Sequence, residues 1–107
     1  MTEVEMTMTG ETCRLTLSGE MTIYTAAQLL PQLKPHIEQT QLELNLGAVP
    51  EIDGAGLQLL LLMRRERATA GRDLRIATCS EPVRDVLELC GLGGVFGLEP
   101  AAVALTA

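Results

Sequence analysis

The sequence predicts a fold of the α/β (α+β) class, in which a mixed β-sheet of four to five strands carries helices packed mainly on one face. Two observations predict it. The chain opens with two segments of alternating apolar and polar residues, which are typical of a β-hairpin. Segments with helical and strand-like spacing then alternate along the rest of the chain. A hairpin followed by such units gives a mixed sheet whose helices gather on one side.

The first two strands are predicted over residues 4–8 and 13–17, where every second residue is apolar. Residues 9–12, Thr-Gly-Glu-Thr, form the turn between them. We expect both strands to be half buried, with these apolar side chains toward the core: Val4, Met6, Met8, Cys13, Leu15 and Leu17.

A helix is predicted to begin at Tyr24 or Thr25 and to continue to Ile37, because its apolar residues recur on one face at helical spacing. Pro31 and Pro35 lie inside this segment. Proline lacks the backbone donor and clashes with the preceding turn, so we expect a kink or an early end of the helix.

The third predicted strand, residues 42–46, leads into a turn and helix at the centre of the chain. Pro50 disfavours helix before it, and Asp53 is a suitable N-cap because its carboxylate accepts hydrogen bonds from the first turn. From Leu57 the residues are almost all apolar, which predicts a helix buried on nearly all sides. The small residues 54–56 leave the start of this helix open to a partner.

Residues 74–77 predict a fourth strand, and a further helix follows with Ser80 as its N-cap and Gly91 after its end. The core face of that helix is predicted to carry Val83, Val86, Leu87 and Cys90. Residues 95–96 predict a fifth short strand or an extended edge, and residues 100–107 a weak final helix.

Charge and length restrict the function classes. The 107 residues are enough for one domain, which we expect to span residues 1–107. The net charge of −6 disfavours binding to nucleic acid and to anionic membranes. Five arginines gather within residues 64–75, and we interpret them as a solvated helix end and loop.

The cysteines and the N-terminus indicate a soluble cytoplasmic protein. Cys13, Cys79 and Cys90 have no metal-ligand spacing, so we interpret them as buried thiols in a reducing compartment. The acidic, alternating N-terminus has no signal-peptide features. No apolar segment reaches the roughly 20 residues that span a bilayer.

Nothing in the residue pattern indicates catalysis. The only histidine, His36, is isolated, and a general base needs a partner that orients it. There is no Walker-type loop and no dinucleotide-binding fingerprint in the sequence. We therefore expect no enzymatic activity, no cofactor and no bound metal.

Residues 52–57, Ile-Asp-Gly-Ala-Gly-Leu, resemble the Asp-x-x-Gly-Leu signature of the STAS domain, the fold of bacterial anti-sigma-factor antagonists. Residues 19–21 and 91–96 also sit where that family has its landmarks, and the order of the elements agrees. The resemblance covers essentially the whole chain and implies the STAS fold.

In anti-sigma-factor antagonists, a serine or threonine between the signature Asp and Gly is phosphorylated by the partner kinase, which is itself the anti-sigma factor. Here those positions are Gly54 and Ala55, which have no hydroxyl. The resemblance therefore implies a partner-binding module that is not switched by phosphorylation at the usual site.

The expected partner-binding residues are those of the signature and nearby hydroxyls. The signature contributes Asp53, Gly54, Ala55, Gly56 and Leu57. Strand ends gather at one edge of such a fold, so phosphorylation could have moved to another hydroxyl there: Thr22, Thr25, Thr78 or Ser80. The alternative for these four is a structural role in caps and turns.

Two functions remain open. The first is a non-catalytic interaction module of bacterial signal transduction, which binds a histidine-kinase-like ATPase (an anti-sigma factor) or acts as a chemotaxis-associated regulator. The alternative is a cytosolic STAS subunit of a lipid-transport ATP-binding-cassette (ABC) transporter, docked on its ATPase. Both imply a protein partner, no nucleic acid and no membrane insertion, and both use the same surface.

Overall fold

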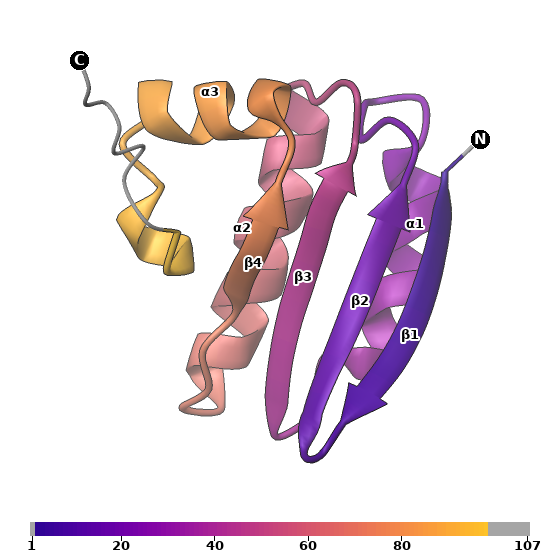
Figure 1. Cartoon of the computed structure of the whole chain (residues 1–107), viewed down its shortest axis with the longest axis vertical. Helices are drawn as coiled ribbons and strands as arrows, with labels where there is room; N and C mark the ends of the chain where they lie inside the picture. Colours follow the sequence, from indigo (N-terminus) through magenta and orange to yellow (C-terminus); the bar gives the residue numbers. More distant parts are fainter. Residues whose placement is uncertain (1, 99–107) are drawn as a thin grey trace.

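The computed structural model describes residues 2–98 and contains a four-stranded sheet in front of two helices (Figure 1). The strands lie side by side in chain order: β1 (Glu3–Thr9), β2 (Thr12–Ser18), β3 (Gln41–Ala48) and β4 (Arg75–Cys79). β1 runs antiparallel to β2, whereas β2, β3 and β4 are parallel. The predicted mixed sheet is confirmed.

The helices cover one face of this sheet. They are α1 (Ala26–Leu33), the 3-10 helix η1 (Lys34–His36), α2 (Gly54–Thr69), α3 (Glu81–Leu89) and the 3-10 helix η2 (Gly94–Phe96). α1 and α2 pack behind the strands, and α3 crosses the end of β4 (Figure 1). The early end predicted for the first helix is confirmed, since α1 stops at Leu33 and Pro35 lies in η1.

The core between sheet and helices is almost entirely aliphatic. α2 supplies its central stripe, where the buried residues recur every three or four positions: Gly56, Leu59, Leu60, Met63 and Arg67. The strands supply every second residue, including Leu15, Leu44 and Ile76. Phe96 in η2 is fully buried beside them.

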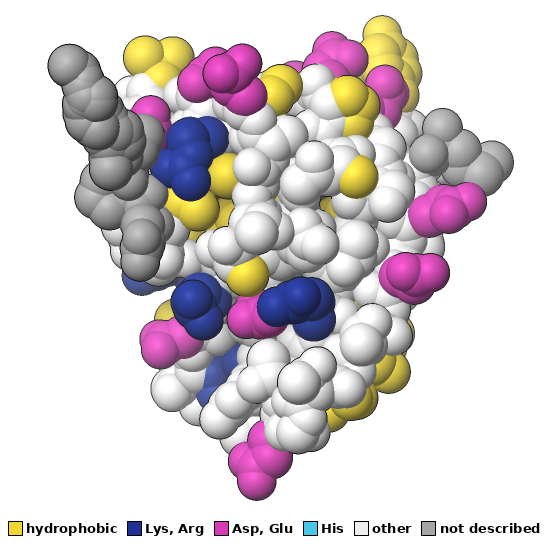
Figure 2. Space-filling model, in the orientation of Figure 1, with side chains coloured by type: hydrophobic (Ala, Val, Ile, Leu, Met, Phe, Trp, Pro, Cys, Tyr) yellow, Lys and Arg dark blue, Asp and Glu magenta, His cyan; other side chains and the backbone are white. Residues whose placement is uncertain are grey.

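The opposite face of the sheet is open and polar (Figure 2). A row of charges crosses it, in which Arg14 and Arg75 flank Glu43 at 2.6 and 3.7 Å. Both arginine side chains are about half exposed or more. Exposed pairs of this kind contribute little to stability, so the packed face determines the fold.

Three burial predictions were wrong, each for a different reason. The outer side of α2 faces solvent, so Leu62 is 41% exposed and Leu61 only partly buried. Met6 and Met8, on the edge strand, are 46% and 47% exposed, beyond the cover of α1. Conversely, Arg67 in the supposedly solvated cluster is only 1% exposed.

The C-terminal elements also differ from prediction. Residues 95–96 belong to η2 and not to a strand, because i→i+3 hydrogen bonds close at Phe96 and at Gly97, which has a left-handed φ of 68°. Residues 100–107 lie outside the described residues. Cys90 is exposed, since it caps the end of α3, and Cys79 is half buried. Of the three cysteines only Cys13 is fully buried.

Candidate functional site

The start of α2 lies against the loop that joins β2 to α1. A parallel bridge pairs Met21 with Ile52. On either side of it, the N–H of Met21 donates to the carbonyl of Glu51 at 2.9 Å, and the N–H of Asp53 donates to the carbonyl of Met21 at 3.2 Å. These bonds bring two segments about 30 positions apart in sequence to one end of the sheet.

Asp53 fastens the two segments together. Its Oδ1 accepts from the N–H groups of Ala55 and Gly56 at 2.9 and 3.1 Å, and its Oδ2 accepts from the N–H of Ile23 at 3.0 Å. The Ile23 N–H above all, and the other two donors, lower the pKa of the Asp53 carboxyl against the opposing effect of desolvation. The predicted N-cap is confirmed, and the same carboxylate also holds the neighbouring loop.

Gly56 allows the close approach of α2 to that loop. A Cβ at this position would lie 2.1 Å from the carbonyl oxygen of Met21 and 2.8 Å from its carbonyl carbon. A Cβ at Gly54 would have nothing within 4 Å. The two glycines therefore differ: Gly56 is required by packing, whereas Gly54 simply leaves the helix start open.

Thr22 and Thr25 are buried and their hydroxyls are already used. The Thr25 hydroxyl accepts from the N–H of Thr22 at 2.9 Å and donates to the carbonyl of Glu20 at 2.8 Å. The Thr22 hydroxyl donates to the Glu20 carboxylate and accepts from the N–H of Tyr24. Exposed fractions of 3% and 6% place both side chains inside the loop, where they shape its turn.

The other two hydroxyls lie outside this loop and bond to residues of β3 and of the segment after it. The Thr78 hydroxyl donates to the side-chain oxygen of Asn45 on the open face of the sheet. Ser80 stands at the N-cap position of α3, but its hydroxyl donates to the carbonyl of Val49 and does not cap the helix. The predicted N-cap position is confirmed, although the side chain makes no capping hydrogen bond.

Two exposed residues that sequence reasoning missed project beside the helix start. Ile23 is 68% exposed and Tyr24 is 84% exposed, although both are large and apolar. The sequence contained an indication of this. Both residues lie between the end of a predicted strand and the first helical residue, so neither follows the strand alternation or the helical spacing of the apolar residues. Next to them a shallow groove of about 370 Å³ separates α1 from α2, lined by Ala26, Ala27, Leu30, Ala55, Gln58, Leu59 and Leu62.

A family model described as "Mlab, STAS domain" matches residues 4–100 of the sequence. The chain belongs to the STAS family. No curated protein sequence matches it.

Solved structures have the same fold as this STAS domain. An anti-sigma factor antagonist from Mycobacterium paratuberculosis superimposes with a TM-score of 0.80 at 20% identity, over 95% of this chain and 88% of that one. The anti-sigma factor antagonist SpoIIAA in its unphosphorylated form gives 0.72 at 24% identity, over 96% and 93%. SpoIIAA from Bacillus in the phosphorylated form gives 0.68 at 23%, over 96% of each chain. At these identities the likeness establishes the fold.

The signature residues of this STAS domain divide into a structural and an open set. Asp53 and Gly56 hold the β2–α1 loop against α2, and Leu57 packs partly against the core. Gly54 and Ala55, between them, are at least partly exposed. The positions at which the family resemblance implies a phosphorylated residue are therefore those that face outward.

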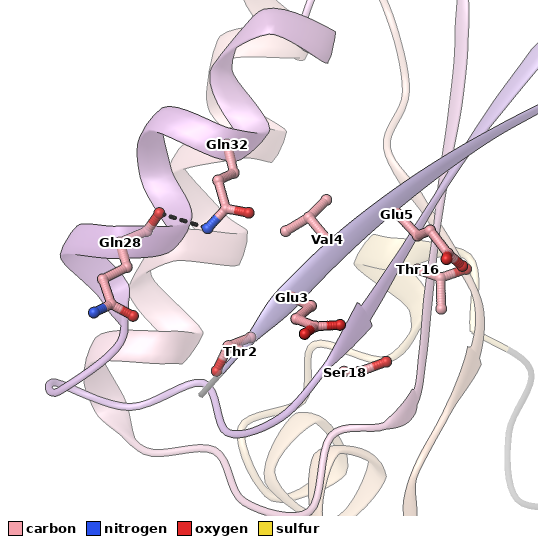
Figure 3. Close-up of a pocket in the computed structure, with 8 residues that line it drawn as sticks. All are labelled: Thr2, Glu3, Val4, Glu5, Thr16, Ser18, Gln28 and Gln32. Carbon is pink, nitrogen blue, oxygen red and sulfur yellow. Dashed lines mark hydrogen bonds between the residues drawn. The ribbon is translucent and has the colours of Figure 1, made fainter.

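Two other depressions lie elsewhere on the surface and are lined mostly by polar and charged residues. Figure 3 shows one of them, around the edge strand β1: Val4 points toward Gln28 and Gln32 of α1, whereas Glu3 and Glu5 lie on the open face with Thr16 and Ser18 of β2. Within residues 2–98, no three His, Cys, Asp or Glu side chains are placed to hold a metal. None of the helices in this part of the chain is long and apolar enough to cross a membrane.

Proposed function

We propose that this STAS domain is a non-catalytic protein–protein interaction module of bacterial signal transduction, similar to anti-sigma-factor antagonists. Its docking surface consists of Ile23, Tyr24, Gly54 and Ala55. The observation that carries the proposal is the position of two exposed apolar side chains against an uncrowded helix start, joined through the Ile23 N–H bond to Asp53.

The chemistry of this docking surface suits a protein partner. Ile23 and Tyr24 offer large apolar area that a partner can remove from water, and tyrosine is among the residues that contribute most at interfaces. The small side chains of Gly54 and Ala55 let a partner approach the backbone closely. Ala55 also lines the groove between α1 and α2, which extends the apolar area.

The charge near the docking surface favours a basic partner. Glu20, Glu51 and Asp53 all lie at this end of the sheet, and the whole chain carries a net charge of −6. Complementary charge accelerates association and selects against wrong partners. We therefore expect the partner to present Lys or Arg around an apolar patch.

Serine or threonine phosphorylation is not expected to switch this docking surface, because Gly54 and Ala55 lack a hydroxyl and those of Thr22 and Thr25 are buried. The protein incubated with its cognate kinase and ATP should keep its unmodified intact mass in mass spectrometry. Phosphate on Thr78 or Ser80, the two candidate hydroxyls outside the loop, would show that the switch has moved and would contradict a constitutive module.

Ala55→Glu should weaken partner binding at least tenfold, a loss of about 1.4 kcal/mol. The substitution adds bulk and negative charge to the docking surface, while the helix macrodipole tolerates an anion at this position. The measurement is quantitative pull-down from a lysate of the source bacterium, followed by titration of the recovered partner, with circular dichroism to verify folding.

The matched control is Ala68→Glu, which makes the same change on an exposed residue of the same helix, about 20 Å along its axis. It should retain the partner. Equal binding by wild type, Ala55→Glu and Ala68→Glu would refute the docking surface. The class of the recovered protein decides between functions: a histidine-kinase-like ATPase or regulator supports signalling in the cytoplasm, whereas an ABC transporter ATPase would establish the alternative.

A further inference from the structure

Strand β1 presents a complete and unprotected sheet edge. It pairs with β2 over all seven of its residues, Glu3–Thr9, in a continuous register without a bulge. Within residues 2–98, no strand pairs with its outer side. Natural edge strands usually carry lysine, proline, a bulge or an inward-pointing charge that prevents pairing with another chain. β1, with the sequence Glu-Val-Glu-Met-Thr-Met-Thr, has no lysine, proline, bulge or inward-pointing charge, and its charged residues are Glu3 and Glu5 on the open face.

The side chains of β1 divide into an apolar and a polar row. Val4, Met6 and Met8 lie on the helix side of the sheet, opposite the buried residues of β2. Figure 3 shows Val4 between β1 and α1, with Glu3 and Glu5 on the other face. Met6 and Met8 are nearly half exposed, and hydrophobic side chains reach the surface along the lower part of β1 in Figure 2. Methionine is flexible and adapts readily to a partner surface.

The backbone groups of the same apolar row point outward. Thr9 and Thr12 flank the two-residue turn of the hairpin and form its first hydrogen-bonded pair. Hydrogen-bonded and non-hydrogen-bonded pairs alternate along an antiparallel ladder. The N–H and C=O groups of Val4, Met6 and Met8 therefore face away from β2 and are available to another strand.

We propose that β1 pairs antiparallel with β1 of a second copy of this chain, with Met6 on the two-fold axis. In this register Met6 faces Met6 of the second copy, and Val4 faces Met8. Glu5 faces Thr7, and Glu3 faces Thr9. Every apolar residue meets an apolar residue and no two charges of the same sign are opposed. The three outward-facing positions provide up to six hydrogen bonds between the copies.

The strand sequence selects this register over its neighbours. If one strand slid by one residue, backbone groups that point outward would face residues whose backbone groups already bond to β2. Only a slide by two residues keeps outward-facing groups opposite one another. A shift in one direction places Glu5 opposite Glu5 of the second copy, and a shift in the other leaves only Glu5–Thr9 of each copy overlapping, because Gly10 and Glu11 lie in the turn. Opposed like charges destabilise a strand pair. The central register alone has full overlap without such repulsion.

The dimer has a defined shape. A two-fold axis perpendicular to the sheet brings the same surface of both copies into contact. The helices of both copies then lie on one face of a continuous eight-stranded sheet. Met6 and Met8 of both copies then cover one another beside α1. Because each copy carries a net charge of −6, dimerisation should strengthen as salt screens the repulsion.

Cysteine cross-linking tests both the dimer and its register. In a Cys90→Ser background, which removes the exposed native thiol, Met6→Cys should form a disulfide-linked dimer under mild oxidation. The two Cα atoms would lie about 5.5 Å apart, within the range that a disulfide bridges. Met8→Cys is the matched control, on the same strand face with the same exposure. Its two copies would lie more than about 10 Å apart and should not cross-link.

Sedimentation equilibrium of the unmodified protein should give the dimer mass at high micromolar concentration. Met6→Lys, which opposes two cations on the axis, should weaken dimerisation at least tenfold, whereas Thr7→Lys, which faces Glu5 of the second copy, should preserve it. A monomer mass at every concentration would overturn the dimer. Cross-linking at position 8 as strong as at position 6 would overturn the register.

Discussion

Gly56→Ala is expected to lower the free energy of unfolding by about 2–3 kcal/mol, although alanine is the better helix former by about 1 kcal/mol. The added Cβ would lie 2.1 Å from the Met21 carbonyl oxygen, a backbone atom that cannot rotate aside. The helix or the loop must move instead. Such a shift would strain the bonds of Asp53 to both segments, since its carboxylate joins Ile23 to the start of α2.

Gly54→Ala is the matched control, two residues earlier in the same first turn. A Cβ there meets nothing within 4 Å, so the variant should be unchanged or stabilised by up to about 1 kcal/mol. Urea denaturation followed by circular dichroism measures both. Equal stabilities for the two variants would mean that α2 does not depend on its close contact with Met21.

The sequence predicted the parts of this site that depend on local chemistry. Asp53 is an N-cap because an aspartate before a helix accepts from the first free N–H groups, whatever the remainder of the chain does. The loop from Thr22 to Thr25 was not predicted in this form. Its hydroxyls bond within the loop, and Ile23 and Tyr24 are forced outward only because the loop closes on Asp53, about 30 positions later.

The alternation of apolar residues predicted which side chains share a face of the sheet. It did not predict how completely neighbouring elements bury them. Met6 and Met8 follow the same alternation as Leu15 and Leu17, yet only the latter two are fully buried. The difference arises because β1 lies at the edge of the sheet and β2 inside it. The order of strands in a sheet depends on long-range pairing, which a local pattern does not contain.

Arg67 shows how a pattern can be present and still be misinterpreted. It lies on the buried stripe of α2, four positions after Met63, but it is surrounded in sequence by other charged residues. Composition therefore suggested a solvated cluster. The helical spacing, followed four residues further, would have placed this one arginine in the interior.

The side chain of Arg67 joins the far end of α2 to two connecting segments. Its Nη1 donates to the carbonyls of Ile37 and Gln39 at 2.8 and 2.6 Å, and its Nε donates to the carbonyl of Asp73 at 2.6 Å. Its Nη2 donates to the carbonyl of Thr40 at 3.4 Å. These carbonyls precede β3 and β4, so one buried guanidinium positions the entry to both strands.

Arg67→Ala should lower the free energy of unfolding by about 3–5 kcal/mol, because it removes a buried side chain and leaves four backbone carbonyl groups without their donors. Arg67→Met, which restores length and apolar volume but no donor, should recover less than half of that loss.

Arg65→Ala is the control, since its exposed side chain lies two positions earlier on the same helix and should change stability by no more than about 0.5 kcal/mol. Urea denaturation of the three variants separates the contributions. Full recovery by Arg67→Met would show that Arg67 stabilises the fold by filling space, and equal losses in Arg67→Ala and Arg65→Ala would show that both act only as surface charges.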